Sequence, residues 1–330
     1  MTYRNKIKNL IASGFFLSIA FATKTVAVFD FFAFFLFLFL IQKEDKKLFI
    51  KKTLLYFFLP FTSAVVLFSL YFLLTGAFGD FVNSVFLQNV SYVGEQNKLL
   101  FPMGMLVLKT MILVSLVGFI YLYREKIPRA TLFIYIWVIF STYNAFFSDR
   151  PYTHYLIVLL PAFSLIVGHF YEYLKTRLID LVLLILIGYL AIIHFEIYQK
   201  NISYYTNFID VLMNKKSIIA YQSFFDKNTP LQYDIANFIK ANVRKDEQVF
   251  LWSDNAQIYA LSNKLPVGKY IVAYHITFYK NAEAITKMQI DTSRPKYIIQ
   301  TIDIPLRQDI LTSYRLRYIM TGAKIYERKI

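Results

Sequence analysis

The amino-acid sequence predicts a mainly α-helical membrane protein, in which a polytopic bundle of about seven transmembrane helices precedes a small extracytoplasmic α/β domain. Of its 330 residues, 57% are hydrophobic and only 17% are charged, whereas soluble domains are nearer a quarter charged. Apolar runs of about 16 to 22 residues recur up to Ile197, and none follows it. We therefore divide the chain into a transmembrane helical region, 1–197, and a C-terminal domain, 198–330.

The first apolar stretch, Leu10 to Ile41, predicts a helical hairpin. As one helix it would be about 46 Å long, against a hydrocarbon core of about 30 Å. Basic residues flank both of its ends, so both ends are expected in the cytoplasm, with Lys24 near the turn. The alternative is a cleaved signal peptide ending at Ala20-Phe21-Ala22. Against it, a second apolar run begins at once with Val26.

The same alternation along the chain predicts seven spans and their direction. The spans lie near residues 8–23, 25–41, 53–74, 104–123, 131–147, 153–173 and 178–197. Most Lys and Arg residues fall on the flanks assigned to the cytoplasm, and the opposite flanks carry only Lys24, Lys98 and Arg150 up to Ile197. The positive-inside rule then predicts a multi-pass plasma-membrane protein with a cytoplasmic N-terminus and an extracytoplasmic C-terminal domain.

One long external loop, Thr75 to Pro102, separates two of these spans. Its apolar residues follow helical spacing and predict a helix on the outer membrane interface. These residues are Phe78, Phe81, Val82, Val85 and Phe86. Such a helix either packs as structural filler or contacts a lipid substrate, and the sequence leaves both interpretations open.

The C-terminal domain shows short alternating units that are typical of an α/β layer. We expect helices around 233–242 and 256–262 and strands at 249–252 and 297–301. A closing hairpin is expected from strands 314–320 and 324–328 about Thr321-Gly322.

Composition excludes several kinds of function. The net charge of +15 would fit nucleic-acid binding, but the basic residues flank apolar runs, where topology explains them. Cysteine is absent, which excludes disulfides, thiolate metal sites and cysteine nucleophiles. The sequence also holds no phosphate-binding glycine loop, nucleophile elbow or zinc signature.

Ionisable residues in the outer third of the spans are the candidate site. Lys24, Asp30, Lys109, Arg150 and His154 all fall there, and burying such groups in a membrane is costly unless they are paired or functional. Cations at this depth suit a phosphate joined to a long lipid. The alternative for Lys24 and Arg150 is that they are snorkelling anchors.

The roles of the other polar residues remain open at this point. Asp30, about 9 Å along its helix from Lys24, is interpreted as a structural counter-ion to Lys24 or Lys109, or alternatively as a base. His154 is either a proton donor or phosphate ligand, or a satisfied polar group. His169 and His194 fall at opposite ends of their spans, and nothing groups them into a metal site.

Three segments resemble one known family. They are the helix end from Gly14 to Lys24, the stretch Arg150-Pro151-Tyr152-Thr153-His154-Tyr155 with Leu160-Pro161 after it, and the order of helix, strand and helix through 235–262. These features resemble bacterial membrane glycosyltransferases of the C-type fold (GT-C), related to protein mannosyltransferases and aminoarabinose lipid A transferases. The usual pattern of that family has glycine where this chain has Ser18.

The resemblance implies transfer of a sugar, in envelope glycan or lipid glycosylation, from a polyprenyl-phosphate donor to a glycan, lipid or protein acceptor at the outer face. We expect Lys24, Arg150 and His154 to bind the carrier phosphate and Tyr152 to line the sugar path. The fold class allows a divalent metal, but no ligand set in the sequence argues for one.

The chain departs from the family at the catalytic carboxylate. The resemblance implies an aspartate in a first external loop, several spans before the Thr23-Lys24 helix end, and no such loop is present here. We expect a truncated gene, an upstream N-terminal half encoded separately, or lost catalysis. No catalytic base is assigned, although the carboxylates nearest the outer face are those of Asp30, Asp80, Glu95 and Asp149. Alternative functions are a non-catalytic membrane subunit and a glycan polymerase, ligase or flippase.

Overall fold

A computed structural model describes most of the chain and divides it into two compact units. The described residues are 3–43, 45–87, 106–148, 152–195, 197–279, 281–302, 305–306, 308–320 and 322–329. The units are Met1–Lys200 and Asn201–Ile330, so the division falls just beyond residue 197, where the sequence places the end of the transmembrane region. Each unit is described by itself.

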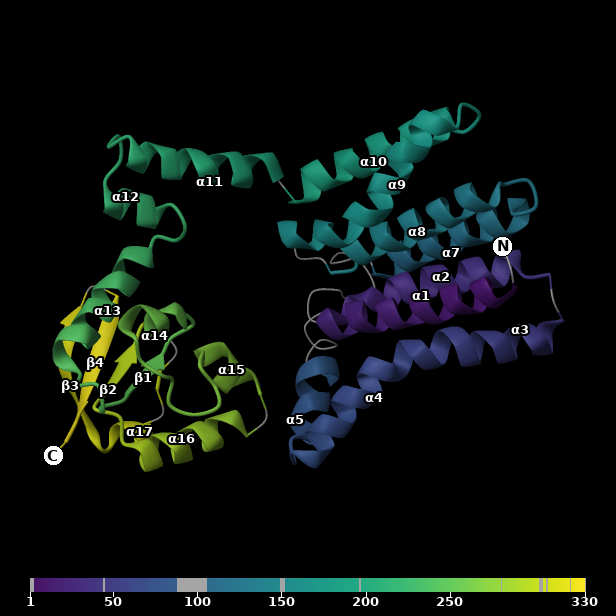
Figure 1. The fold of residues 1–330 in the computed structure, drawn as a ribbon. Helices are drawn as coiled ribbons and strands as arrows, with labels where there is room; N and C mark the ends of the chain where they lie inside the picture. Colours follow the sequence, from purple (N-terminus) through teal and green to yellow (C-terminus); the bar gives the residue numbers. More distant parts are fainter. Residues whose placement is uncertain are drawn as a thin grey trace. The chain divides into compact units, whose positions relative to one another are not determined.

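The first unit is built of helices (Figure 1). Helix α3 (Lys46–Thr53), a π-helical turn η2 (Leu54–Phe58) and α4 (Leu59–Leu74) form one continuous helix. The remaining elements are α1 (Tyr3–Thr23), η1 (Thr25–Ala27), α2 (Val28–Ile41), α5 (Phe78–Val82), η3 (Asn83–Leu87), α7 (Leu106–Tyr123), α8 (Arg129–Ala145), η4 (Thr153–Leu159), α9 (Leu160–Glu172) and α10 (Arg177–Phe195).

Four helical segments of this unit are long and apolar enough to cross a membrane. They are Lys46–Leu74, Leu106–Tyr123, Thr153–Glu172 and Arg177–Phe195. The predicted spans near 8–23, 25–41 and 131–147 are helical too. The apolar helical segments Ile7–Thr23 and Thr25–Ile41 are shorter than these four, and so is α8, with 17 residues. A helical membrane protein is therefore supported, while the count of seven spans stays a prediction.

Two features of the first spans agree with the sequence. The long apolar stretch breaks between Thr23 and Val28, and Figure 1 shows α1 and α2 side by side, as a hairpin requires. The described part of the 75–102 loop is helical, in α5 and η3. Residues 88–102 of that loop lie outside the described residues.

Small residues on α1 let the next long helix approach closely. A side chain at Gly14 would overlap the carbonyl oxygen of Phe57. One turn later, the buried hydroxyl of Ser18 accepts a hydrogen bond from the Ala64 backbone N–H at 2.9 Å. Small residues in this spacing are typical of tight helix pairs in membranes. Ser18 thus has a structural role.

The second unit combines helices with a four-stranded sheet. Its helices are α11 (Ile197–Leu212), which begins in the first unit, α12 (Ile218–Ser223), α13 (Thr229–Asn242), α14 (Gln257–Ser262), α15 (Ala273–Phe278), α16 (Ala282–Ser293) and α17 (Gln308–Leu311). Its strands are β1 (Val249–Trp252), β2 (Tyr297–Gln300), β3 (Tyr314–Met320) and β4 (Ala323–Arg328). The predicted helices, strands and closing hairpin are all confirmed.

The sheet has the order β1-β2-β4-β3, with β1 parallel to β2 and the other neighbours antiparallel. Side chains of β1 alternate between two cores, as a pleated strand requires. Val249 and Leu251 pack with α13 and α14, and Phe250 and Trp252 pack with α15, α16 and α17. Helices therefore cover both faces of the sheet.

Both edges of the sheet depart from a regular strand edge. At β1 the N–H of Leu251 donates to the Tyr259 hydroxyl at 2.9 Å, and the carbonyl of Ser253 accepts from a backbone N–H of α15. At β3 the pairing with β4 is irregular between Leu316 and Tyr318. An exposed arginine, Arg317, sits at that irregularity and lies 3.5 Å from Glu327.

Candidate functional site

The break between α1 and α2 holds Lys24 in an extended conformation. Its φ and ψ are −151° and 117°, and it caps the short turn η1. In a membrane, a broken helix leaves backbone groups that other parts of the protein must satisfy. Here the buried side chain of Asn144, on α8, donates to the carbonyl of Val26 at 3.2 Å. The turn that presents Lys24 is thus anchored to a neighbouring helix.

The Lys24 side chain points to an aromatic group at the start of η4. Its Nζ lies 5.0 Å from the ring centre of Tyr155, a cation–π contact. Tyr155 packs edge-on against His154 at 4.5 Å and against Tyr152 at 5.8 Å, while Tyr152 and His154 stack at 5.6 Å. The structure therefore brings together Lys24, Tyr152 and His154 from the predicted site, and it adds Tyr155.

The other residues of the predicted site are Arg150, Asp30 and Lys109. Arg150 lies outside the described residues. The Asp30 carboxylate accepts a hydrogen bond from Trp137 Nε1 at 2.7 Å, and within the described chain no salt bridge joins it to Lys24 or Lys109. The interpretation of Asp30 as their counter-ion is therefore replaced by a structural role, because its bond ties α2 to α8.

Lys109 lies in the first turn of α7, where the packing is aromatic. Its neighbour Thr110 shares a hydrogen bond of 2.9 Å with the Tyr143 hydroxyl. The Tyr143 ring packs edge-on against Phe29 at 5.4 Å. These contacts join the ends of α7, α8 and α2 beside the helix break.

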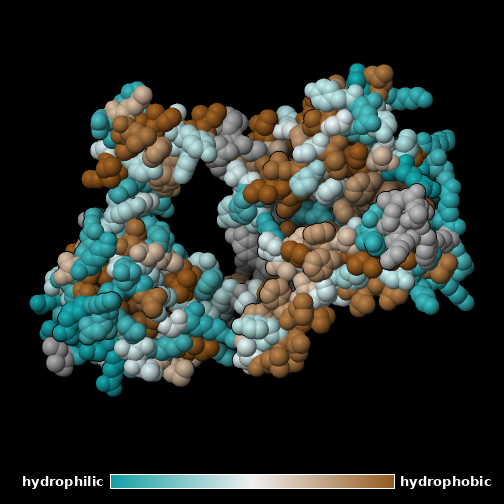
Figure 2. Space-filling view, in the orientation of Figure 1, coloured by the Kyte–Doolittle hydropathy of each residue, from teal (hydrophilic) through white to brown (hydrophobic). Residues whose placement is uncertain are grey.

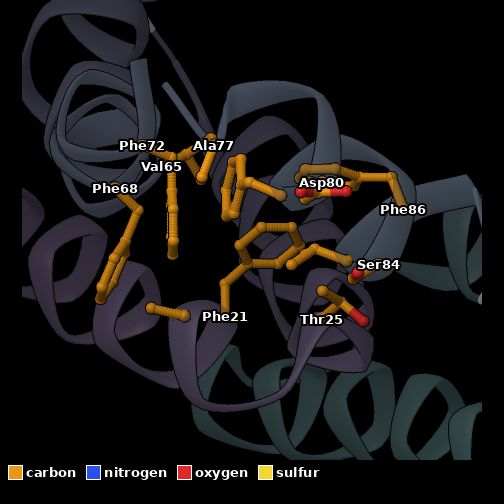
Figure 3. A pocket seen from close by; sticks show the side chains of 12 residues that line it. Phe21, Thr25, Val65, Phe68, Phe72, Ala77, Asp80, Ser84 and Phe86 are labelled. Atoms are coloured by element: carbon orange, nitrogen blue, oxygen red, sulfur yellow. The ribbon is translucent and has the colours of Figure 1, made fainter. Parts of the chain in front are cut away.

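A pocket of about 390 Å³ adjoins the helix break (Figure 3). Ala22 and Thr25, on either side of Lys24 in the chain, both line it. In Figure 3 the polar side chains of Thr25, Asp80 and Ser84 lie on one side of the pocket, away from Phe68. Most of the wall is apolar, with Phe21, Val65, Phe68, Phe72 and Phe81 from α1, α4 and α5. The pocket thus has an apolar body and a polar rim.

A second polar cluster, in α8, α9 and α10, was missed from the sequence. The His169 ring lies 2.8 Å from the Asp180 carboxylate through Nδ1 and 2.8 Å from the Thr131 hydroxyl through Nε2. Asp180 also accepts from the Tyr135 hydroxyl at 2.8 Å and from Thr176 at 3.4 Å. The side chains of His169 and Asp180 are 1% and 0% exposed.

A signal for this cluster was present in the sequence. His169 and Asp180 fall at the same end of consecutive predicted spans, joined by a short turn, and each is expensive to bury alone. The pair holds one imidazole and one carboxylate. Across the described residues, no three His, Asp or Glu side chains are grouped closely enough to hold a metal ion.

Comparison of the chain with models of protein families, with curated proteins and with solved structures gives no match. The GT-C resemblance therefore stays a hypothesis. Any function has to be argued from the geometry of the Lys24 group and its pocket.

Proposed function

We propose that the protein binds a polyprenyl-phosphate-linked sugar at the outer face of the plasma membrane and takes part in transferring that sugar to an envelope acceptor. One observation carries the proposal: the helix break presents a lysine beside exposed aromatic rings and next to an apolar pocket with a polar rim. This arrangement supports binding of a ligand with an anionic head and a long apolar tail.

Each part of the ligand has a counterpart. The Lys24 ammonium would hold the phosphate, and charge-assisted bonds of this kind are worth about 1.5–3 kcal/mol. The pocket would receive the first isoprene units, and its volume lies in the range of small-molecule sites, about 300–1,000 Å³. Tyr152, 44% exposed, offers an aromatic face and a hydroxyl to the sugar.

The transfer step needs a base and a stabilised leaving group. The acceptor hydroxyl oxygen attacks the anomeric carbon, the bond from that carbon to the phosphate oxygen breaks, and the hydroxyl proton passes to a carboxylate. Lys24 would stabilise the departing phosphate. We assign the base to Asp80, because its side chain lies on the pocket rim.

Carrier binding is tested on the purified full chain in nanodiscs, with polyprenyl phosphate as the probe and unphosphorylated polyprenol as the comparison. We expect Lys24→Gln to weaken polyprenyl-phosphate binding about 10- to 100-fold, the loss of one charge-assisted bond, and to leave polyprenol binding unchanged. The matched control is Lys126→Gln, because Lys126 Nζ also lies over a tyrosine ring, that of Tyr123, at 5.7 Å. Equal polyprenyl-phosphate affinity in Lys24→Gln and Lys126→Gln would contradict a phosphate site at Lys24.

The tail site has a separate test. Replacing Ala22 with Phe adds a ring to the wall of the pocket, so long-chain polyprenyl phosphate should bind more weakly while a short-chain prenyl phosphate keeps its affinity. If both ligands lose affinity equally, the pocket does not hold the tail.

Catalysis is tested by sugar transfer from a polyprenyl-phosphate sugar to envelope acceptors. We expect Asp80→Asn to abolish transfer and to retain carrier binding. Carrier binding without transfer in the unmodified protein would favour the non-catalytic, carrier-binding subunit instead.

A further inference from the structure

Helices α11 and α12 present a broad apolar surface. At 100° per residue, the apolar side chains of α11 cover about half of its circumference, and Ser203, Thr206, Asn207 and Asp210 fall on the other half. The exposed apolar residues of the two helices are Ile202, Tyr204, Tyr205, Phe208, Ile209, Leu212, Ile218, Ile219, Phe224 and Phe225. Figure 2 shows hydrophobic residues gathered over this segment.

The buried side chain of α11 lies on its polar face, while its apolar face meets the α12 segment at its edge, where Tyr204 contacts Phe225. Asn207 is 2% exposed, and its amide donates to the carbonyl of Tyr221 on α12 at 3.2 Å. Its side-chain oxygen accepts from Lys216 Nζ at 2.8 Å, and Lys216 also lies 3.8 Å from Asp210. A soluble helix pair would bury its apolar stripe. The reversed arrangement indicates that an apolar medium covers the outer face.

Helix α11 starts directly after a candidate membrane span. Helix α10 is long and apolar enough to span a bilayer and ends at Phe195, and α11 begins at Ile197. A single residue separates the two helices in the chain, so the start of α11 lies within a few ångströms of the end of α10. A helix of 16 residues is about 24 Å long, shorter than the hydrocarbon core. It also carries Asp210, so it suits the interface plane better than a span.

We infer that α11 and α12 lie in the lipid headgroup region, with the apolar face of α11 directed into the acyl chains. Amphipathic helices of this kind bury their apolar face about 5–10 Å into the boundary between headgroups and acyl chains. Lys215 and Lys227, both exposed, lie at the ends of the α12 segment and favour anionic lipids. The partner is therefore the bilayer surface itself. This inference does not depend on the proposed sugar transfer.

The absence of cysteine gives a clean test. Single cysteines at Ile202, Tyr205, Ile209 and Leu212 are spin-labelled in the full chain, with Thr206 and Asp210, two polar-face residues whose side chains keep solvent exposure, as matched controls on the same helix. The chain is reconstituted in phosphatidylcholine nanodiscs with and without phosphatidylglycerol. Paramagnetic accessibility to oxygen and to a water-soluble nickel complex then reports the depth of each label.

We expect high oxygen and low nickel accessibility at the apolar positions, the reverse at the controls, and greater depth with phosphatidylglycerol. High nickel accessibility at every position means a water-facing surface and overturns the inference. Low accessibility to both reagents at the apolar positions means a protein partner and also overturns it. Photoactivatable acyl chains applied to the unmodified protein give an independent readout, because they should label α11 and leave α13 unlabelled.

Discussion

The first unit contains two polar clusters that differ in how completely their groups are satisfied. In the His169–Asp180 cluster the imidazole and the carboxylate are buried, and each hydrogen-bonds to further side chains. In the Lys24 cluster a cation lies over the ring of Tyr155 beside a pocket, and Tyr152 is exposed. A satisfied cluster holds helices together, whereas an incompletely satisfied one retains capacity for a ligand.

The largest expected effect is loss of the buried pair. His169→Ala leaves the Asp180 carboxylate buried without its imidazole partner, so we expect the free energy of unfolding to fall by about 3–5 kcal/mol. Asp180→Asn keeps an acceptor oxygen but removes the charge that faces the imidazole, so we expect a smaller fall. Reversible unfolding in detergent measures this change. Glu172→Gln, an exposed carboxylate at the end of α9, is the control and should change it little. A loss of under 1 kcal/mol in Asp180→Asn would contradict a structural role for the pair.

An intermediate effect is expected at the anchor of the helix break. Asn144→Leu removes the side-chain donor from the Val26 carbonyl, at a cost of about 1–3 kcal/mol in stability. It should also weaken polyprenyl-phosphate binding, because the turn that presents Lys24 loosens. Thr142→Val removes only a bond within α8 and serves as the control. Unchanged polyprenyl-phosphate affinity in Asn144→Leu would show that the anchoring of the helix break does not affect carrier binding.

In the Lys24 cluster, a substitution should change carrier affinity while it leaves the free energy of unfolding almost unchanged. We expect Lys24→Gln to change the free energy of unfolding by no more than about 0.5 kcal/mol, as for other surface sites without buried bonds. Polyprenyl-phosphate affinity should fall about 10- to 100-fold in the same variant. The free energy of unfolding and the carrier affinity should be measured on one preparation. In Asp180→Asn we expect the opposite result, a loss of stability with unchanged carrier affinity. A large stability loss in Lys24→Gln would make the lysine a structural residue.

The smallest expected effect lies in the C-terminal domain, in a surface network formed by Glu247, Arg244 and Lys296. Partial burial of Glu247 raises its pKa, but the N–H of Arg244 and the Lys296 ammonium, 2.8 and 3.0 Å away, outweigh it, and the pKa is lowered. The unfolded chain, with a glutamate pKa near 4.3, then takes up the proton first as the pH falls. Stability is complete above that pKa and is lost below it.

Equilibrium unfolding of the full chain, followed through a probe in the C-terminal domain between pH 7 and pH 3, measures this dependence. Glu247→Gln should flatten it, and Asp234→Asn, an exposed carboxylate on α13, should not. An unchanged pH profile in Glu247→Gln would exclude this network as the source.

Local patterns predicted much of the fold. The strand Val249–Trp252 and the closing hairpin follow from short apolar units between turn residues, and the break near Lys24 follows from the length of the apolar stretch against the bilayer. The span near 53–74 begins earlier in the structure, at Lys46, because Asp45 accepts hydrogen bonds from the first backbone N–H groups and starts a charged helical turn. Hydropathy detects only the apolar part of such a helix.

The candidate site was only partly predictable. Lys24, Tyr152 and His154 were expected to act together because their charge and depth are visible in the sequence. The bond from Asn144 to Val26 and the pairing of Asp30 with Trp137 join residues more than a hundred positions apart, and no local pattern encodes them. Helix α11 was missed although its apolar residues follow helical spacing, and the spacing alone does not tell which face of a helix packs inward.

The irregular edges of the sheet limit how the C-terminal domain associates with other proteins. An unpaired strand edge is a template on which a second chain adds a strand. Here the Tyr259 hydroxyl occupies an outward N–H of β1, while β3 combines an irregular register with exposed arginine. Two copies of this domain therefore have no smooth strand edge on which to form a continuous intermolecular sheet, and crowding at the membrane favours contacts through side chains over fibrous growth.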